Sequence, residues 1–283
     1  MILSGKELSE LVKKQISECC GSFARRFSRK PCLAVVLVGD NPASLTYVRS
    51  KKKACEELGI AHLDVSFEST ISQDELLSCI AGLNSDPSVD GILVQMPLPS
   101  HVDELAVTEA ILPEKDVDGF HPLNTAALWQ KRPNSSCVVP CTPMGIIHLL
   151  EEAGCQIAGK NAVVIGRSQI VGLPMAKLLL DRNATVTICH SRTADLANFT
   201  RQADILVVAI GKAKFVTGDM VKEGAVVMDV GMDRDEEGKL CGDVDFDSVA
   251  AKASVITPVP GGVGPMTICC LMENTIKCFL AKM

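Results

Sequence analysis

The sequence predicts an α/β protein built from two α/β domains, and three observations support this prediction. Short apolar runs of strand length alternate with segments of helical periodicity along most of the chain, which is typical of right-handed βαβ units and a mainly parallel sheet. A stretch rich in proline, asparagine and polar residues, 97–143, separates an earlier and a later half. The length of 283 residues is sufficient for two domains.

The first half contains three expected strands, each followed by a helical pattern. The strands are expected at 33–38, 62–67 and 91–95, and the helices at 44–58, 72–83 and 102–111. Ser72 and Glu75 have the spacing of a capping box, as do Ser4 and Glu7 at the start of an amphipathic N-terminal segment. After residue 111 we expect mostly loop, up to a helix near 144–153.

The second half repeats the alternation with shorter elements. Strands are expected at 162–165, 184–188, 205–209, 225–230 and 254–256, and a final helix at 266–280. The charged run 233–238 predicts a solvated hairpin turn.

Composition excludes several classes of function. Hydrophobic residues make up 47% of the chain, and the net charge of −6 without a long basic run argues against a nucleic-acid surface. No apolar run approaches the roughly 18 residues of a membrane span, and the N-terminal segment lacks the apolar core of a signal peptide. The 13 cysteines are odd in number and favour reduced thiols in a cytoplasmic protein. Cys137 and Cys141 are four apart, but no further ligand spacing completes a metal site, so we predict none.

The segment 161–180, NAVVIGRSQIVGLPMAKLLL, is the most informative of the chain. An apolar strand leads into Gly166, and Gly172 opens an apolar helix, which is the strand, glycine turn and helix of a dinucleotide-binding Rossmann unit. Ser168 stands where the full motif has its middle glycine, so an ordinary strand-to-helix turn remains the alternative.

The next expected strand indicates which dinucleotide is bound. An NAD site usually has an acidic residue roughly 20 residues after the glycines, to bind the ribose hydroxyl. None occurs here, whereas Ser191 and Arg192 follow the strand and Arg167 lies in the glycine loop. These residues favour the 2′-phosphate of NADP, the alternative being a merely polar strand end. Gly211, after another strand, also fits the rim of such a unit.

Tyr47 and Lys51 are the most suggestive pair in the first half. They are spaced i and i+4 and therefore lie on one face of the expected helix. A lysine that is partly desolvated can have a lowered pKa and move protons near neutral pH. The alternative is that Lys51, Lys52 and Lys53 form one solvated helix face.

Other residues lie where parallel strands or loops could present them to a ligand. Gln95 ends the third expected strand, and Asp118 lies in the loop beyond it. The run 258–267, PVPGGVGPMT, has no charge and lets backbone approach a flat ligand closely, although a tight connector is the alternative.

Together these residues resemble the methylenetetrahydrofolate dehydrogenase/cyclohydrolase family. The resemblance covers nearly the whole chain and rests on six motifs in order: NPASLTYVRSKKKACEELGI (41–60), DGILVQMPLP (90–99), PEKDVDGFHPLN (113–124), PCTPMGI (140–146), GRSQIVGLPMAKLL (166–179) and TPVPGGVGPMT (257–267).

The resemblance implies a particular architecture. Residues 1–139 would form a catalytic folate-binding domain to which the C-terminal helix, 266–283, returns, and 140–265 an NADP-binding Rossmann domain. The folate would lie in a cleft between the two domains, and the active form would be a homodimer paired through the Rossmann domains.

The resemblance also implies a role for each matching residue. Lys51 would be the acid–base residue, Tyr47 would stack on the pterin, Gln95 would tune Lys51, and Asp118 would bind the pterin edge. The backbone of Pro260, Gly261 and Gly262 would line the folate cleft. The residues implied in NADP binding are Gly166, Arg167, Ser168, Ile170, Gly172, Ser191, Arg192 and Gly211.

The implied reactions are oxidation of 5,10-methylenetetrahydrofolate with NADP and hydrolysis of the methenyl product to 10-formyltetrahydrofolate. Three alternatives stay open on sequence alone: a monofunctional dehydrogenase or cyclohydrolase of the same family, a shikimate-type NADP dehydrogenase, and a folate- or nucleotide-binding protein without activity.

Overall fold

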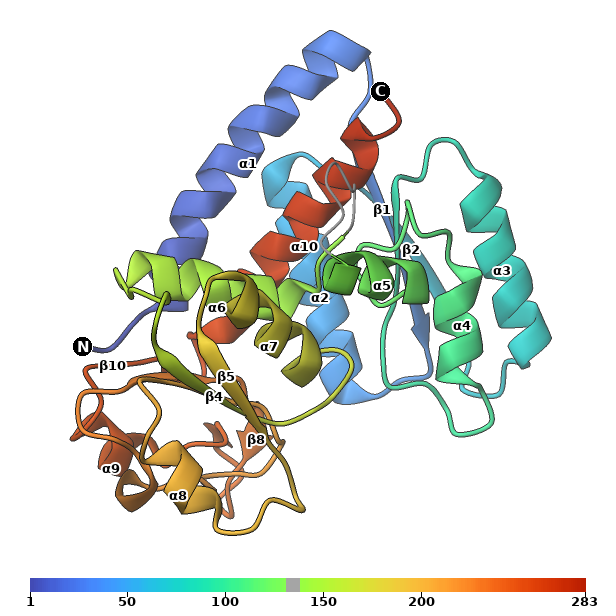
Figure 1. The fold of residues 1–283 in the computed structure, drawn as a ribbon. Helices are drawn as coiled ribbons and strands as arrows, with labels where there is room; N and C mark the ends of the chain where they lie inside the picture. Colours follow the sequence, from blue (N-terminus) through green and yellow to red (C-terminus); the bar gives the residue numbers. More distant parts are fainter. Residues whose placement is uncertain (131–137) are drawn as a thin grey trace. The chain divides into compact units, whose positions relative to one another are not determined.

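The chain forms two compact units in the computed structural model, which describes residues 1–130 and 138–283. One unit comprises Val12–Val139 and Leu271–Met283, and is called here the Lys51 unit. The other comprises Met1–Leu11 and Pro140–Cys270, and is called the Gly166 unit. Each unit has its own parallel sheet (Figure 1), so the predicted fold class of two α/β domains is confirmed.

The sheet of the Lys51 unit has three parallel strands in the order β2-β1-β3. They are β1 (Cys32–Val38), β2 (Ala61–Phe67) and β3 (Gly91–Val94). The helices between and after them are α2 (Pro42–Leu58), α3 (Gln73–Ser85), α4 (Glu104–Ala110) and α5 (Pro122–Gln130). The central strand β1 is buried from Leu33 onwards, which its uninterrupted apolar sequence requires.

One face of this sheet packs on α3 and α4, which lie side by side (Figure 1). Alternate residues of β1, such as Ala34 and Val36, join Leu76 and Ile80 of α3 in one buried cluster. The helix α3 begins at the expected capping box, with Ser72 Oγ accepting from Glu75 N and the Glu75 carboxylate accepting from Ser72 N. The local sequence therefore fixes where α3 starts, and its apolar face fixes where it packs.

Two long helices contribute residues to both units. They are α1 (Gly5–Phe27) and α10 (Val263–Leu280). Within the Lys51 unit, Phe23 and Phe27 near the end of α1 pack on the fully buried Phe279 of α10, and the guanidinium of Arg29 stacks over the Phe279 ring. Arg29 also makes a two-pronged ion pair with the buried Asp90.

The sheet of the Gly166 unit has five parallel strands in the order β10-β7-β6-β4-β5. They are β4 (Asn161–Ile165), β5 (Thr185–Cys189), β6 (Ile205–Val208), β7 (Val226–Asp229) and β10 (Val255–Ile256). The helices are α6 (Cys141–Glu152), α7 (Gly172–Asp181), α8 (Leu196–Thr200) and α9 (Phe246–Ala250), with a 3-10 turn at Gly218–Met220. The predicted hairpin is present as β8 (Asp233–Arg234) paired antiparallel with β9 (Leu240–Cys241).

Two expectations about helices differ from the structure. The region after residue 111 was expected to be mostly loop, but it contains α5, whose Pro122 occupies the first helical position, where a missing amide costs nothing. The helix α6 begins at Cys141 rather than near 144, with Pro143 in its first turn. In both cases prolines that read as loop residues lie in the first turn of a helix. Cys137 lies outside the described residues.

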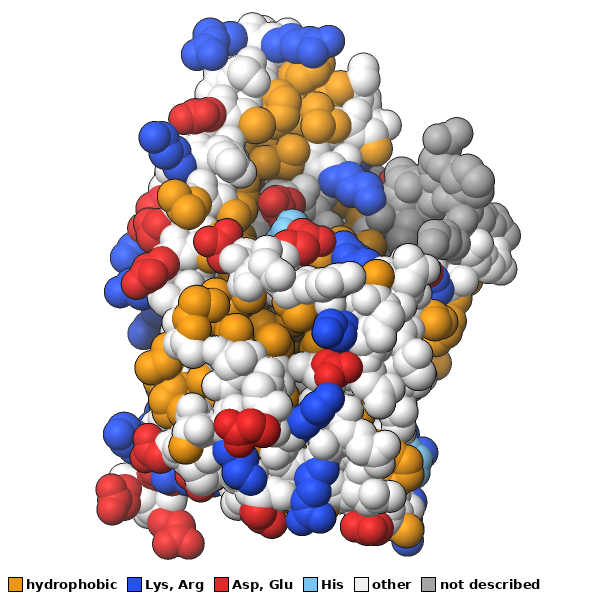
Figure 2. Space-filling model, turned by 60° about the vertical axis from the view of Figure 1, so that its left-hand side comes forward, with side chains coloured by type: hydrophobic (Ala, Val, Ile, Leu, Met, Phe, Trp, Pro, Cys, Tyr) orange, Lys and Arg blue, Asp and Glu red, His pale blue; other side chains and the backbone are white. Residues whose placement is uncertain are grey.

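Among the described residues, no helix is both long enough and apolar enough to cross a membrane. On the face shown in Figure 2, lysine and arginine side chains alternate with acidic ones across the described surface. This mixed pattern agrees with the small negative net charge of the chain.

Candidate active site and cofactor rim

Lys51 is tethered on the face of α2 that also carries Tyr47. Its Nζ donates a hydrogen bond of 2.8 Å to Gln95 Oε1. The Gln95 amide is itself oriented, because its Nε2 donates to Met96 O at 2.7 Å and its backbone N donates to Val36 O at 2.8 Å. The side chain of Gln95 therefore presents a fixed acceptor to the lysine from the carboxyl end of β3.

The three consecutive lysines of α2 have different partners and do not form one solvated face. Lys52 Nζ is 2.8 Å from Asp64 Oδ2 on β2, and Lys53 Nζ is 3.7 Å from Glu57 one turn further along α2. Lys51 alone of the three faces Gln95. Lys51 is therefore directed toward Gln95, whereas Lys52 and Lys53 form ion pairs at the surface.

Asp118 reaches the same region through the register of the loop that carries it. Asp116 forms a parallel bridge with Ile92 of β3, and Ile92 N donates to Lys115 O at 2.7 Å. The loop runs parallel to β3, and Asp116 is paired with Ile92. Asp118, two residues after Asp116, is therefore level with Val94, two residues after Ile92. This register brings Asp118 to the carboxyl end of β3, beside Gln95.

The charge of Asp118 depends on its surroundings. Burial raises the pKa of its carboxyl to about 6, the nearby Lys51 lowers it, and the negative charge of Asp116 raises it. Tyr47 is 37% exposed, and partial burial raises the pKa of its phenol, so it stays neutral at physiological pH.

Two residues that sequence reasoning missed hold the Asp118 loop. The buried Asp116 carboxylate accepts from Gly119 N at 3.0 Å, His121 N at 2.8 Å and Asn124 Nδ2 at 2.9 Å. Asn274 Nδ2 on α10 donates to Val117 O and to Val139 O, both at 2.9 Å. Asp116 could have been found as the first acid of the Asp-Val-Asp-Gly run, but nothing local marks Asn274, which lies in an ordinary helix.

The Gly166 unit brings three strand ends together around the predicted glycine turn. Gly166 N donates to Cys189 O at the end of β5, and Ala209 N after β6 donates to Ile165 O at the end of β4. Gly166 has φ +126°, and a Cβ built on it would lie 2.3 Å from Ala209 O. Only glycine fits at this position, which is the close backbone approach that the motif requires.

Ser168, at the position of the missing middle glycine, holds the loop that leads into α7, whose N-cap residue is Val171. Its Oγ accepts from Val171 N at 3.2 Å and from Gly172 N at 3.3 Å. Gly172 is also obligatory, because a Cβ there would lie 2.3 Å from Gly166 O. Arg167 and Ile170 are exposed on the same loop. The hydroxyl therefore supplies helix-terminal hydrogen bonds that a glycine could not.

Ser191 and Arg192 lie in a tight turn just after β5. His190 N donates to Thr193 Oγ1 at 2.9 Å, and Arg192 N donates to His190 Nδ1 at 3.1 Å. Both Ser191 and Arg192 are exposed. Since β4 and β5 are parallel neighbours, this turn and the Gly166 loop follow the same edge of the sheet.

The Gly211 loop after β6 is held by a buried aspartate. Asp243 Oδ2 accepts from Ile210 N at 2.7 Å, and its Oδ1 accepts from Lys212 N at 2.6 Å. The two amides flank Gly211, which has φ +62°. Sequence reasoning missed Asp243, which follows a charged hairpin and carries no motif of its own.

The run 258–267 packs against the beginning of the chain within the Gly166 unit. Lys6 N donates to Gly261 O at 3.0 Å, and Gly262 leaves no room for a Cβ on Gly5. Pro260 is exposed and Gly262 is buried. The glycines thus permit a close approach of two backbone segments here.

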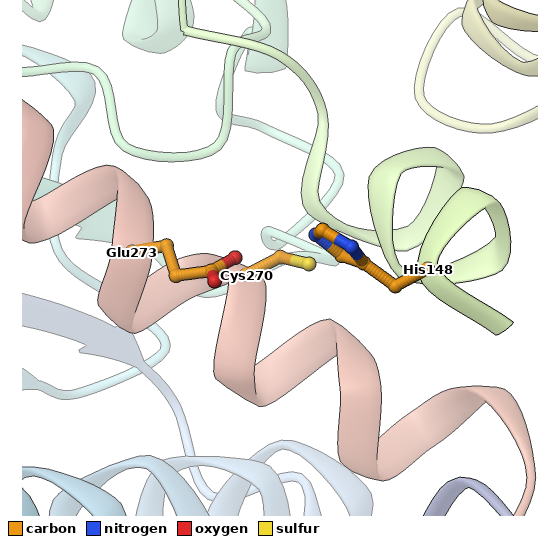
Figure 3. A group of neighbouring side chains, drawn as sticks. All are labelled: His148, Cys270 and Glu273. Atoms are coloured by element: carbon orange, nitrogen blue, oxygen red, sulfur yellow. The ribbon is translucent and has the colours of Figure 1, made fainter. Parts of the chain in front are cut away.

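The structure also brings together side chains that the sequence did not connect. His148 of α6 and Cys270 of α10 have ligand-type atoms within 4.8 Å of each other, and Glu273 follows one turn later on α10 (Figure 3). The two residues of the Gly166 unit, His148 and Cys270, are too few for a structural zinc site, which needs four ligands.

The fold and the rim together define an α/β protein with a dinucleotide-binding domain and a second α/β unit that carries a tethered lysine. Residues 3–118 match the family model described as the tetrahydrofolate dehydrogenase/cyclohydrolase catalytic domain, and residues 140–283 match that of its NAD(P)-binding domain. The chain belongs to the tetrahydrofolate dehydrogenase/cyclohydrolase family.

Individual relatives agree over the full length. The bifunctional protein FolD of Streptococcus pneumoniae serotype 2 is 57% identical over 99% of this chain and 97% of its own. The crystal structure of the bifunctional FolD enzyme from Campylobacter jejuni has a TM-score of 0.96 and 50% identity, covering 100% of this chain and 99% of that chain. The FolD structure from Trypanosoma brucei, complexed with NADP and an inhibitor, has a TM-score of 0.96 and 38% identity, covering 100% and 98%.

The chain is therefore a bifunctional enzyme of folate metabolism. It oxidises 5,10-methylenetetrahydrofolate to the methenyl form with NADP and hydrolyses that product to 10-formyltetrahydrofolate. This result decides against the monofunctional, shikimate-type and non-catalytic alternatives.

Proposed function

We propose that Lys51, Gln95 and Asp118 form the folate site, and that Lys51 is the acid–base residue of the hydrolysis step. The observation that carries this proposal is the 2.8 Å hydrogen bond between Lys51 Nζ and Gln95 Oε1, near the half-buried carboxyl of Asp118, whose pKa Lys51 lowers. A tethered amine with an adjacent acid is the arrangement that positioned proton transfer needs.

Hydrolysis of the methenyl cation requires one water and the release of one proton. The water adds to the bridging carbon and loses its first proton. The bond from that carbon to the pterin nitrogen then breaks as this nitrogen gains a proton, and the remaining hydroxyl proton is released to solvent as the formyl carbonyl forms. In its neutral form Lys51 accepts the proton of the attacking water, and as an ammonium it returns a proton to the leaving nitrogen. Gln95 holds the amine in place through both transfers, since an amide oxygen accepts from the amine and the ammonium alike.

Asp118 and Tyr47 would bind the pterin. An ionised carboxylate accepts two N–H bonds from an aminopyrimidine edge, as it does from a guanidinium. Tyr47, partly exposed and neutral, offers a flat ring for stacking on the same face of α2 as Lys51. The backbone of Pro260, Gly261 and Gly262 would complete the folate contacts.

NADP would be held at the rim of the Gly166 unit, and when bound it accepts the hydride from the methylene carbon. Gly166 and Gly172 have no space for a Cβ, so backbone can approach a pyrophosphate there. Arg167, Ser191 and Arg192 are exposed at the same sheet edge. The two arginines would neutralise the 2′-phosphate, and the hydroxyl of Ser191 would donate a hydrogen bond to it. Ser168, Ile170 and Gly211 would complete the cofactor contacts.

We propose the corresponding domain assignment. Residues 1–139 would be the catalytic folate domain with the C-terminal segment 266–283 returning to it, and 140–265 the NADP domain. The contacts of Leu271–Met283 within the Lys51 unit support the return of the C-terminal segment.

We propose further that the enzyme is a cytoplasmic homodimer. Cysteines such as Cys20, Cys55 and Cys278 are free thiols, which is typical of a reducing compartment. Leu180 and Phe199 are exposed apolar residues of the Gly166 unit that a second copy would cover. Light scattering coupled to size exclusion tests the dimer, and a monomer at micromolar concentration would contradict it.

A coupled absorbance assay tests the function. Purified enzyme is mixed with methylenetetrahydrofolate and NADP⁺, and NADPH and the methenyl intermediate are followed separately. We expect NADPH to form with little methenyl accumulation. Methenyl accumulating to the same amount as NADPH would contradict an effective cyclohydrolase, and the same rate in a Lys51→Met variant would contradict the proposed site.

A further inference from the structure

The buried carboxylate of Asp229, the last residue of β7, anchors the backbone that follows the hairpin β8–β9. Its Oδ1 accepts from Gly231 N at 3.0 Å and from Asp243 N at 2.9 Å, and its Oδ2 accepts from Val244 N at 3.1 Å. A Cβ on Gly242 would overlap Asp229 Oδ2, so glycine at this position lets the segment 242–244 approach the carboxylate. One buried side chain therefore fixes three backbone amides.

The segment 242–244 in turn supports the Gly211 loop at both of its ends. Before and after Gly211, the carboxylate of Asp243 accepts from the two flanking backbone amides. Further along, Lys214 N donates to Gly242 O at 2.9 Å, and Val216 N donates to Asp243 O at 3.0 Å. The position of residues 210–216 therefore depends on a segment that Asp229 holds.

The acceptor role of Asp229 requires its ionised form. Burial raises the pKa of its carboxyl to about 7, the three backbone hydrogen bonds lower it, and the charge of Asp243 raises it. An ionised carboxylate has only acceptors, whereas a carboxamide of the same shape has one oxygen and one NH₂ group. If the oxygen of an asparagine keeps Gly231 N and Asp243 N, its NH₂ group faces Val244 N, and a buried amide loses its acceptor.

We propose that Asp229 is a positioning residue for NADP: it fixes the segment 242–244, and this segment fixes the Gly211 loop at the cofactor rim. Asp229 acts through Asp243 and the backbone rather than through contact with the cofactor. The proposal rests on the proposed role of Gly211 in NADP binding. Loss of the carboxylate should therefore loosen the loop and weaken cofactor binding, while folate binding and the chemical step stay unchanged.

The test compares Asp229→Asn with wild type at pH 8, where the carboxyl is mostly ionised. Hydrogen exchange at the amides of Ile210 and Lys212 is measured in the cofactor-free protein, and the Kd of NADP⁺ by calorimetric titration. We expect faster exchange at both amides. The Kd should rise by about tenfold, the size expected for one lost hydrogen bond to a buried amide.

Dehydrogenase kinetics separate a positioning role from a general loss of structure. In Asp229→Asn the KM for NADP⁺ should rise with its Kd, whereas kcat at saturating NADP⁺ and the KM for methylenetetrahydrofolate should stay at the wild-type values. A protein that is only less well folded would lose kcat or folate binding as well, and that result would overturn the proposal.

Asp204→Asn is the matched control in the same unit. Asp204 directly precedes β6 and so lies at the opposite end of the sheet, where its Oδ2 accepts from Asn161 N at 2.9 Å. This variant should lower the free energy of unfolding, but it should leave both the exchange at Ile210 and Lys212 and the Kd of NADP⁺ unchanged. A Kd that rose as much as in Asp229→Asn would show that any loss of stability in this unit weakens the cofactor, and would contradict the proposal.

A second variant tests the route through Asp243. In an Asp243→Asn background, Asp229→Asn should weaken NADP⁺ binding much less than it does in wild type, because both substitutions loosen the same loop. Fully additive losses would overturn this route. An Asp229→Asn protein that does not fold would assign Asp229 to the fold itself and overturn the positioning role.

The two readouts distinguish failure of this proposal from failure of the Gly211 assignment. Unchanged exchange in Asp229→Asn would overturn the role of Asp229, whatever the Kd does, and leave Gly211 as a candidate cofactor contact. Faster exchange with an unchanged Kd would show that Asp229 controls the loop but that the loop does not hold NADP. That result would overturn both the positioning role and the assignment of Gly211.

Discussion

The Lys51 site and the cofactor rim are built in opposite ways. At the Lys51 site, polar side chains from α2, from the carboxyl end of β3 and from the Asp118 loop converge, and each is fixed by another side chain or by the register of the loop. At the rim, backbone geometry dominates: Gly166 and Gly172 leave no room for a Cβ, and Ser168 holds the loop that leads into α7. If the proposed roles hold, chemistry at the first site should depend on side-chain identity, whereas cofactor binding at the second should depend on the shape of the backbone.

Removing the amine of Lys51 should have the largest effect. Lys51→Met should reduce cyclohydrolase activity by about 10²–10⁴-fold, the usual contribution of a positioned acid–base group. More of the dehydrogenase should remain, because hydride transfer depends mainly on orientation. The two rates are measured separately with methylene and methenyl substrates. Lys53→Met, which removes an exposed lysine two residues on, is the control and should change neither rate. Equal loss of both activities in a folded Lys51→Met protein would contradict this division of roles.

A methyl group at Gly166 should be the most damaging change at the rim. In Gly166→Ala the added Cβ overlaps Ala209 O, and such overpacking costs about 1–3 kcal/mol of folding stability. The positive φ of this position costs an alanine about 1–2 kcal/mol more. The free energy of unfolding and NADP⁺ affinity should both fall, as measured by urea denaturation and calorimetric titration. Gly154→Ala has a positive φ but nothing within 4 Å of the added Cβ, so it should show the smaller loss and normal NADP⁺ binding. If the two variants behaved alike, the close approach at Gly166 would not matter.

The charge of Asp118 should make folate binding depend on pH. Its folded-state pKa of about 6 is raised above the ordinary value, so the carboxylate is lost as the pH falls through about 6. Affinity for a non-reacting folate should then fall by up to about tenfold for each pH unit below this pKa. Asp118→Asn should bind more weakly and with no such dependence, whereas Glu109→Gln, at an exposed position on α4, should keep the wild-type profile. A flat wild-type profile from pH 5 to 7 would exclude the carboxylate as the pterin ligand.

The smallest effect is expected at Ser168. Ser168→Ala removes the hydroxyl that accepts from Val171 N and Gly172 N, and loss of such hydrogen bonds costs about 1 kcal/mol. We expect a modest fall in stability together with a several-fold rise in the Kd of NADP⁺. Ser72→Ala removes the N-cap of α3 in the Lys51 unit and should lower stability without changing NADP⁺ binding. An unchanged Kd in Ser168→Ala would restrict Ser168 to a structural role.

The sequence by itself determined most of the secondary structure and the nature of the cofactor rim. Strand and helix periodicity, capping boxes and obligatory glycines are local properties, so the glycine turn at 161–180 and the capped start of α3 could be predicted from neighbouring residues. The short helices α5, α8 and α9 were not predicted. In α5 only Asn124 and Leu128 are buried, so its sequence carries little of the apolar periodicity that marks a helix.

Only the tertiary structure decided which side chains meet. The spacing of Tyr47 and Lys51 could be read along one helix, but the partner of Lys51 is 44 residues away, and Asn274 holds the Asp118 loop from 157 residues away. Asp243 was likewise no more than the neighbour of a charged hairpin until the fold placed it beside the Gly211 loop. Such contacts depend on strand order and register, which no local sequence pattern encodes. Hydrogen bonds between distant residues form only once the packed sheet has fixed the positions of both partners.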